Sequence, residues 1–178
     1  MNLFNEYIWL IHFISLSLQK KIIEMKTNKL CIDDYVINSR NGSYVKIDGI
    51  TNRKVGYHGN RNKATSHLMY SRREEIEPIE LNLSFLESLG LFEIINGGCD
   101  AIYKSEDDSV HIRYSNMFGT VRIYFDNSDA DVFFRCEYFH TLINVLKCLS
   151  EGHEEANGVL AALDEAMSNL IKKSNEKA

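Results

Sequence analysis

Short segments that alternate between apolar and polar residues dominate the first half of the chain. Residues 43–50 place Val45 and Ile47 on one side, which is typical of a half-buried strand. The Asn-Gly pair at residues 41–42 just before it is a strong hairpin signal. Further strands are predicted over residues 33–37, 54–58, 67–71 and 75–81. Five short strands joined by tight turns predict a small β-barrel module of SH3-like or OB-like kind over residues 26–80.

The second half begins after Pro78 and shows the same strand pattern with longer segments. Strands are predicted over residues 91–95, 101–105, 110–115, 120–125 and 130–136. Turn-rich linkers separate them, which predicts an antiparallel meander. In the fourth strand Val121, Ile123 and Phe125 share one side. We expect that side to face the core and the other to face solvent or a partner.

Three helices are predicted to pack against this sheet. The first has Ser84 as its N-cap, Glu87 completing a capping box, and Gly90 as its C-cap. The second covers residues 137–149, with a buried stripe at spacings of three and four and Thr141 on the opposite face. That stripe comprises Phe139, Leu142, Ile143, Leu146 and Leu149. The last helix covers residues 154–173, with a stripe of Leu160, Leu163, Met167 and Leu170.

The predicted fold class is therefore α+β. A small SH3-like β-barrel module is followed, over residues 81–178, by an antiparallel sheet packed by helices. Before them, residues 1–25 form a hydrophobic N-terminal extension.

The extension has an apolar run at residues 7–18, shorter than the roughly 20 residues that span a bilayer. A signal peptide carries positive charge before its apolar run, but here Glu6 precedes the run and the first lysines follow it. The extension is interpreted first as a start-site artefact, with translation starting at Met25 rather than Met1, or as a loosely packed helix. A membrane anchor over residues 3–18 and a signal peptide are the alternatives. We expect a cytoplasmic protein, with membrane contact only if that anchor is real.

Charge divides the chain more sharply than its average suggests. The 178 residues include 44% hydrophobic and 25% charged side chains, with a net charge of −5, which excludes a disordered chain. Residues 40–73, however, contain eight basic residues and one acid, a net charge of +7, whereas residues 83–178 carry −8. The commonest reading of such a segment is a solvated face. A polyanion-binding face, or a face that docks on the acidic half, are the functional alternatives.

Tyrosines and histidines lie among these cations, a mixture with which small barrels bind nucleic acid. The candidate nucleic-acid-binding residues are Arg53, Lys54, Arg61, Lys63, Arg72 and Arg73.

No motif reaches a catalytic signature. Residues 59–65 lack the second glycine and the Ser or Thr of a phosphate loop, and His153 has no second histidine for a zinc protease motif. Asp126, Asp129 and Asp131 are interpreted as an acidic hairpin turn, because no glutamate closes a calcium loop. The four cysteines form no C-x-x-C pair and are expected to be reduced thiols. We therefore predict no cofactor and no metal site.

Three groups of residues carry a resemblance to known sequences. Leu30 and residues 33–36 resemble an L-R-I-G-D-Y-V opening, and residues 76–92 resemble I-x-P-I-P-L followed by L-x-x-x-G-F. Residues 139–144 resemble V-H-x-L-Q-N. The chain in this way resembles a family of short, uncharacterised proteins encoded in phages and mobile elements of gut bacteria. The resemblance covers about residues 30–149 and implies no activity and no functional residues.

The function predicted from these observations is that of a small non-enzymatic phage or mobile-element protein. It would bind a host or phage protein, or nucleic acid. The alternative is an enzyme with a histidine-centred site near His140, which lies on the helix with the buried stripe, close to Tyr138 and Asn144. The oligomeric state is not predicted.

Overall fold

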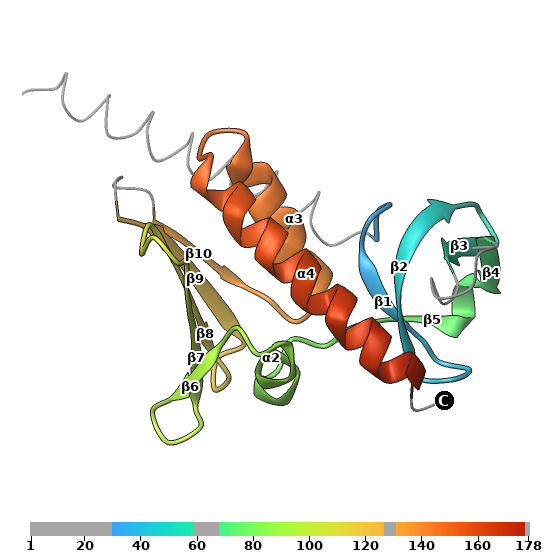
Figure 1. Cartoon of the computed structure of the whole chain (residues 1–178), viewed down its shortest axis with the longest axis horizontal. Helices are drawn as coiled ribbons and strands as arrows, with labels where there is room; N and C mark the ends of the chain where they lie inside the picture. The colour runs from blue at the N-terminus through green and yellow to red at the C-terminus, as the bar shows by residue number, and fades with distance from the viewer. Residues whose placement is uncertain (1–29, 59–67, 127–130, 177–178) are drawn as a thin grey trace, which may run out of the picture.

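The computed structural model describes residues 30–58, 68–126 and 131–176. These ranges form two five-stranded antiparallel sheets and three α-helices, which confirms the predicted α+β class. Figure 1 shows the two sheets on opposite sides of a pair of long helices. The N-terminal extension lies outside the described residues, and with it both the proposed anchor and the Met25 start. Among the helices that are described, none is long and apolar enough to cross a membrane.

The first sheet has the strand order β4-β3-β2-β1-β5. Its strands are β1 (Tyr35–Asn38), β2 (Ser43–Ile50), β3 (Lys54–His58), β4 (Leu68–Arg72) and β5 (Ile76–Pro78), with the 3₁₀ helix η1 (Arg73–Glu75) between the last two. In the described residues β4 and β5 remain the two edges of this sheet. The closed barrel of the prediction is therefore not found.

Two strand boundaries differ from the prediction for local reasons. Asp33 has a φ of +70°, a left-handed conformation that does not continue a strand, so β1 begins only at Tyr35. The predicted strand over residues 75–81 is shortened at both ends. η1 precedes it, and Pro78 ends it because proline has no N–H for the ladder.

The second sheet is the predicted meander, with the order β10-β9-β8-β7-β6. Its strands are β6 (Glu93–Ile95), β7 (Asp100–Lys104), β8 (Val110–Ser115), β9 (Thr120–Phe125) and β10 (Asp131–Arg135). Val121, Ile123 and Phe125 are buried as expected, and Arg122 is exposed on the other side. Strict alternation therefore predicted both the strand and the direction in which it faces.

The first helix, α2 (Leu83–Leu89), begins two residues earlier than a Ser84 cap would allow. The N-cap is Asn82, whose Oδ1 accepts a hydrogen bond from the Phe85 backbone N–H at 2.9 Å. The prediction of Ser84 as the cap is therefore wrong. Gly90 is confirmed as the C-cap, with a φ of +72° that favours glycine.

Two alanine substitutions distinguish Asn82 from Ser84 as the N-cap of α2. Asn82→Ala removes the acceptor of the Phe85 N–H and should lower the free energy of unfolding by about 1 kcal/mol. Ser84→Ala, at an exposed position inside the first turn, should change it by less than about 0.5 kcal/mol. Urea unfolding followed by circular dichroism measures both. Equal losses in the two variants would contradict the assignment of the cap.

The remaining helices are α3 (Phe139–Ser150) and α4 (Glu155–Glu176), which pack on each other and lie between the sheets (Figure 1). The first eight residues of α3 are all buried, so the predicted stripe is only part of its contact surface. Thr141 is buried as well, and its predicted placement on an open face is wrong. The physical reason is that α3 also contacts α4 and β1, so several of its sides are covered.

Two groups of buried side chains hold these layers together. The smaller one belongs to the first sheet and comprises Val36, Val45, Ile47, Val55, Tyr57 and Ile76. The larger one fills the space between the meander and the helices and includes Tyr35 from β1. The first sheet therefore contributes to the main core through Tyr35 and Ile37 of β1 and Tyr44 of β2.

Candidate functional site

Four of the six predicted nucleic-acid-binding cations lie in the described residues, and the fold brings them together. Lys54 on β3 is paired in register with Arg72 on β4. Arg73 donates its backbone N–H to the carbonyl of Arg53 at 3.1 Å. All four side chains are exposed. We call this end of the β3–β4 hairpin, with Tyr70, the basic face. Arg61 and Lys63 lie outside the described residues.

The alternation of β3 decides which way the basic face points. Val55 and Tyr57 are buried in the first sheet, so Lys54 and Gly56 lie on the opposite side. Tyr70 is the register partner of Gly56. A Cβ at Gly56 would lie 3.1 Å from the Tyr70 ring, so the missing side chain leaves room for the ring over β3. Tyr70 is therefore 58% exposed and lies beside Lys54 and Arg72, which are register partners on β3 and β4.

Within the described residues, no acidic side chain of residues 83–178 forms an ion pair with the basic face. Among the described residues, the ion pair formed by these four cations is the one between Arg72 and Glu74 at 4.0 Å, and both side chains are largely exposed. The charge that does bridge the two halves is Lys46, whose Nζ lies 2.5 Å from Oδ1 of Asp164 on α4. Among the ion pairs of the described residues, Lys46 is thus the cation of the basic segment that contacts the acidic half, and the side chains of the basic face are exposed.

A cavity of about 400 Å³ lies where β1 and β2 meet α3 and α4, within the usual range for small-molecule sites. Its lining residues are Asp33, Tyr35, Lys46, Ile143, Lys147, Leu160, Ala161 and Asp164. The Tyr35 hydroxyl donates to Asp164 at 2.5 Å, and the Lys46 ammonium lies 5.2 Å above the Tyr35 ring. These polar groups already bind one another, so we interpret the cavity as a packing junction between the first sheet and the helices.

Two buried polar side chains also lie at this junction. Asp34 is fully buried; its Oδ2 accepts the Cys31 N–H at 2.6 Å, and its Oδ1 has no donor. Asn144 on α3 has a buried Nδ2 with no acceptor at ordinary hydrogen-bond distance in the described residues. Burial raises the pKa of the Asp34 carboxyl above its ordinary value, against the opposing effects of its backbone hydrogen bond and of its interaction with Asn144, both of which lower that pKa.

His140 is a buried histidine in the core. It is 3% exposed and stacks on Tyr138, with ring centroids 5.6 Å apart. Its Nδ1 has no hydrogen-bond partner. Burial lowers its pKa to about 4, so the imidazole is neutral at pH 7. General acid–base catalysis needs a partner within hydrogen-bond reach; among the described side chains His140 has none, and the enzyme alternative stays an untested prediction.

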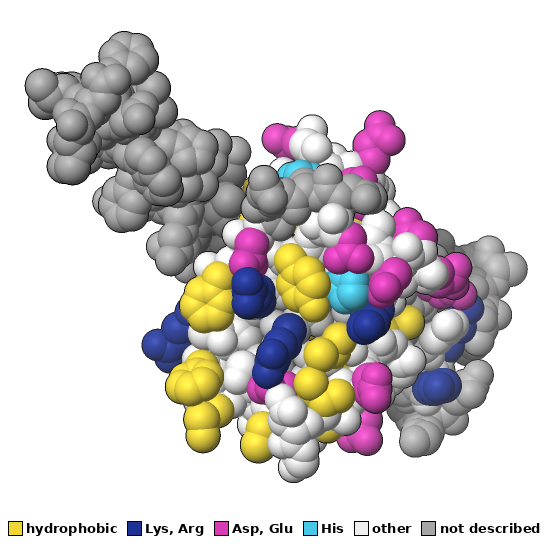
Figure 2. Space-filling model, turned by 90° about the vertical axis from the view of Figure 1, so that its left-hand side faces the viewer, with side chains coloured by type: hydrophobic (Ala, Val, Ile, Leu, Met, Phe, Trp, Pro, Cys, Tyr) yellow, Lys and Arg dark blue, Asp and Glu magenta, His cyan; other side chains and the backbone are white. Residues whose placement is uncertain are grey.

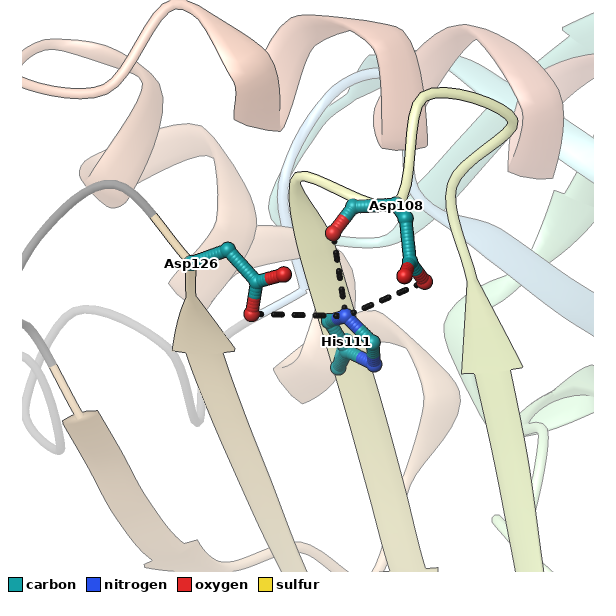
Figure 3. Close-up of side chains that lie close together, drawn as sticks. All are labelled: Asp108, His111 and Asp126. Atoms are coloured by element: carbon teal, nitrogen blue, oxygen red, sulfur yellow. Dashed lines mark hydrogen bonds and ion pairs between the residues drawn. The ribbon is translucent and has the colours of Figure 1, made fainter.

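Two of the three aspartates interpreted as an acidic hairpin turn lie in the described residues, at the two ends of the connection between β9 and β10. Asp131 forms a two-nitrogen ion pair with Arg122 on the neighbouring strand. Asp129 lies outside the described residues. Asp126 instead lies beside His111 and Asp108 (Figure 3). Asp126 and Asp131 therefore flank the β9–β10 hairpin connection as interpreted, but their side chains do not form one group.

We call Asp108, His111 and Asp126 the histidine–aspartate cluster. His111 Nε2 lies 3.3 Å from Oδ1 of Asp108 and 3.5 Å from Oδ1 of Asp126. It also lies 3.0 Å from the backbone oxygen of Asp108. The dashed lines of Figure 3 converge on this one nitrogen from both sides of β8.

The β7–β8 turn positions one side of the cluster. The Asp107 carboxylate accepts hydrogen bonds from the Ser105 and Ser109 hydroxyls at 2.6 and 2.7 Å, which lowers its pKa to about 2. Asp108 follows with a φ of +58°, a conformation that aspartate tolerates in turns. The other side comes from the end of β9, where Asp126 donates its N–H to the Ser109 carbonyl at 3.0 Å.

Sequence reasoning missed this cluster, although a signal for it was present. Asp108 and His111 are three residues apart, but Asp126 is distant in the chain. The meander pairs Val110 with Phe125, so the residues flanking that pair meet at one end of the sheet. Writing out the register of the two predicted strands would have placed Asp126 next to the β7–β8 turn.

Comparison with known protein families, curated proteins and solved structures gives no match for this chain, so the candidate functions rest on its own residues.

Proposed function

We propose that the chain is a small non-enzymatic binding protein whose basic face binds single-stranded nucleic acid. The observation that carries the proposal is Tyr70, 58% exposed and flanked by the register pair of Lys54 and Arg72. An aromatic ring offers a base a stacking surface, and neighbouring cations neutralise phosphates. Arg53 and Arg73 extend the positive charge along the same end of the hairpin.

The architecture of the first sheet supports this proposal. The order β4-β3-β2-β1-β5, with η1 between β4 and β5, is the arrangement we would expect of an SH3-like barrel that has remained open. The basic face then lies on the edge hairpin, where a strand of nucleic acid is not hindered by neighbouring strands. The phage or mobile-element origin, and an intracellular site of action, rest on the sequence resemblance and remain part of the proposal.

Binding by the basic face should depend steeply on salt. If four phosphates are neutralised, the slope of log K against log salt for a single strand should be about −3. Affinity should then fall about 50-fold between 50 and 200 mM salt. Fluorescence anisotropy of the full chain with a labelled 15-nucleotide oligothymidine or oligouridine measures this slope.

Two variants distinguish charge neutralisation from stacking. The double variant Lys54→Ala/Arg72→Ala should flatten the slope by about 1.4, because two phosphate contacts are lost. Tyr70→Ala should weaken binding by about 1–3 kcal/mol per stacked base and leave the slope unchanged. The matched control is Lys104→Ala/Arg135→Ala, which removes two exposed cations from the second sheet. A full chain that retains neither probe at 50 mM salt would overturn the proposal and leave a protein partner.

A further inference from the structure

We propose that the histidine–aspartate cluster is a binding site for a divalent transition-metal cation of the zinc or manganese type. The site lies on the second sheet and is independent of the basic face. The donors are Nε2 of His111 and one carboxylate oxygen each from Asp108 and Asp126 (Figure 3). These three atoms lie within 4.8 Å of one another.

The distances fit ligands around a shared ion better than hydrogen bonds between the side chains. A charge-assisted N–H···O bond is about 2.7–2.9 Å long, but the two carboxylate contacts of Nε2 are 3.3 and 3.5 Å. Ligands at about 2.0–2.1 Å from a tetrahedral zinc are about 3.3–3.4 Å from each other. The two separations measured from Nε2 are therefore close to the edges of such a coordination shell.

The alternative occupant of the cluster is a proton on Nε2. Three oxygens face this nitrogen: both carboxylates and the Asp108 carbonyl at 3.0 Å. One N–H points at one acceptor, and the carbonyl is the one within hydrogen-bond distance. The two carboxylates would then still face each other without a shared donor. A cation placed among the donors contacts all of them at once.

Packing positions the His111 ring, whose Nδ1 has no hydrogen-bond partner in the described residues. His111 is only 7% exposed, and its ring stacks on Tyr124 with centroids 4.8 Å apart and planes 12° apart. The two carboxylates, by contrast, are more than half exposed, so an ion can reach them from solvent. On the exposed face of this sheet, acidic side chains gather beside a histidine (Figure 2).

The donor set also indicates the class of metal. One imidazole nitrogen with carboxylate oxygens suits zinc, manganese, iron or cobalt, whereas calcium and magnesium prefer oxygen donors alone. Lys104 lies 3.9 Å from Oδ1 of Asp108 and opposes a cation there, but its side chain is 60% exposed and can turn away. The three side chains leave further coordination positions for water.

Equilibrium dialysis of the chelator-treated full chain against Mn²⁺, with the free ion read by electron paramagnetic resonance, tests the site. Manganese is chosen because the exposed Cys31 and Cys99 could capture zinc. We expect one ion per chain. Asp126→Asn, at an exposed side chain, and His111→Gln should each weaken binding about tenfold or more.

The matched controls come from the pair of His58 and Asp48, whose Nε2 and Oδ2 atoms are 3.7 Å apart with no second carboxylate in the described residues. Asp48→Asn and His58→Gln should leave Mn²⁺ binding unchanged. Circular dichroism shows whether each variant is folded. If His111→Gln does not fold, Asp126→Asn alone tests the site. The proposal is overturned if the full chain binds no Mn²⁺, or if Asp126→Asn binds as tightly as the unmodified chain.

Discussion

Phe139→Ala is expected to lower the free energy of unfolding by about 3–5 kcal/mol, the range for removing a fully buried phenylalanine. Phe139 is 0% exposed at the first turn of α3. Its ring meets Phe85 of α2 edge-on at 5.1 Å and Tyr35 of β1 at 6.3 Å. Three elements that are distant in sequence therefore share this one side chain, and its loss leaves a cavity among them.

Phe133→Ala provides the matched control, because it removes the same atoms from a ring that is 58% exposed. Phe133 lies on β10, on the outward side of the meander, where hydrophobic side chains stand between cations (Figure 2). Its replacement should cost less than about 1 kcal/mol. Urea unfolding of both variants measures the difference. Similar losses would show that α3 does not pack at the junction as described.

His140 should make the stability of the protein fall as the pH is lowered from 7 to 5. Its folded pKa of about 4 lies below the value of 6.5 for a free histidine, so the unfolded chain binds the proton more tightly. The stabilisation is complete above pH 6.5 and is lost as the pH falls towards 4. From these values the loss is about 2 kcal/mol by pH 5 and about 3 kcal/mol in full.

His140→Phe removes this titration and keeps a ring against Tyr138. The decrease in the free energy of unfolding between pH 7 and pH 5 should therefore be about 2 kcal/mol smaller in the variant. Asp34, whose raised pKa makes the folded state less stable as the pH rises, is present in both proteins and cancels in the comparison. The same pH dependence in both proteins would refute the burial of a neutral His140.

Local patterns predicted much of the secondary structure. The bounds of β2, β3, β8 and β9 agree with the alternation of apolar residues, because a strand with one buried side repeats every two residues. Gly90 was predicted as a C-cap for an equally local reason, since glycine takes the left-handed conformation without cost. Four exposed cations of the basic face were predicted from charge alone; their pairing across β3 and β4 required the register.

The packing of distant elements decided which side chains are buried and which polar groups meet. The pattern of α3 indicated one buried stripe, but the helix lies between two sheets and beside α4, so Thr141, His140 and Asn144 are buried too. In the sequence, Lys46 is one of eight cations in the basic segment. It pairs with Asp164 because α4 packs on β2. The histidine–aspartate cluster likewise exists because the register of β8 and β9 joins two turns. Sequence alone determined the conformation of short segments, whose periods and turn residues act locally; which polar groups meet depends on distant segments, and only their packing sets those distances.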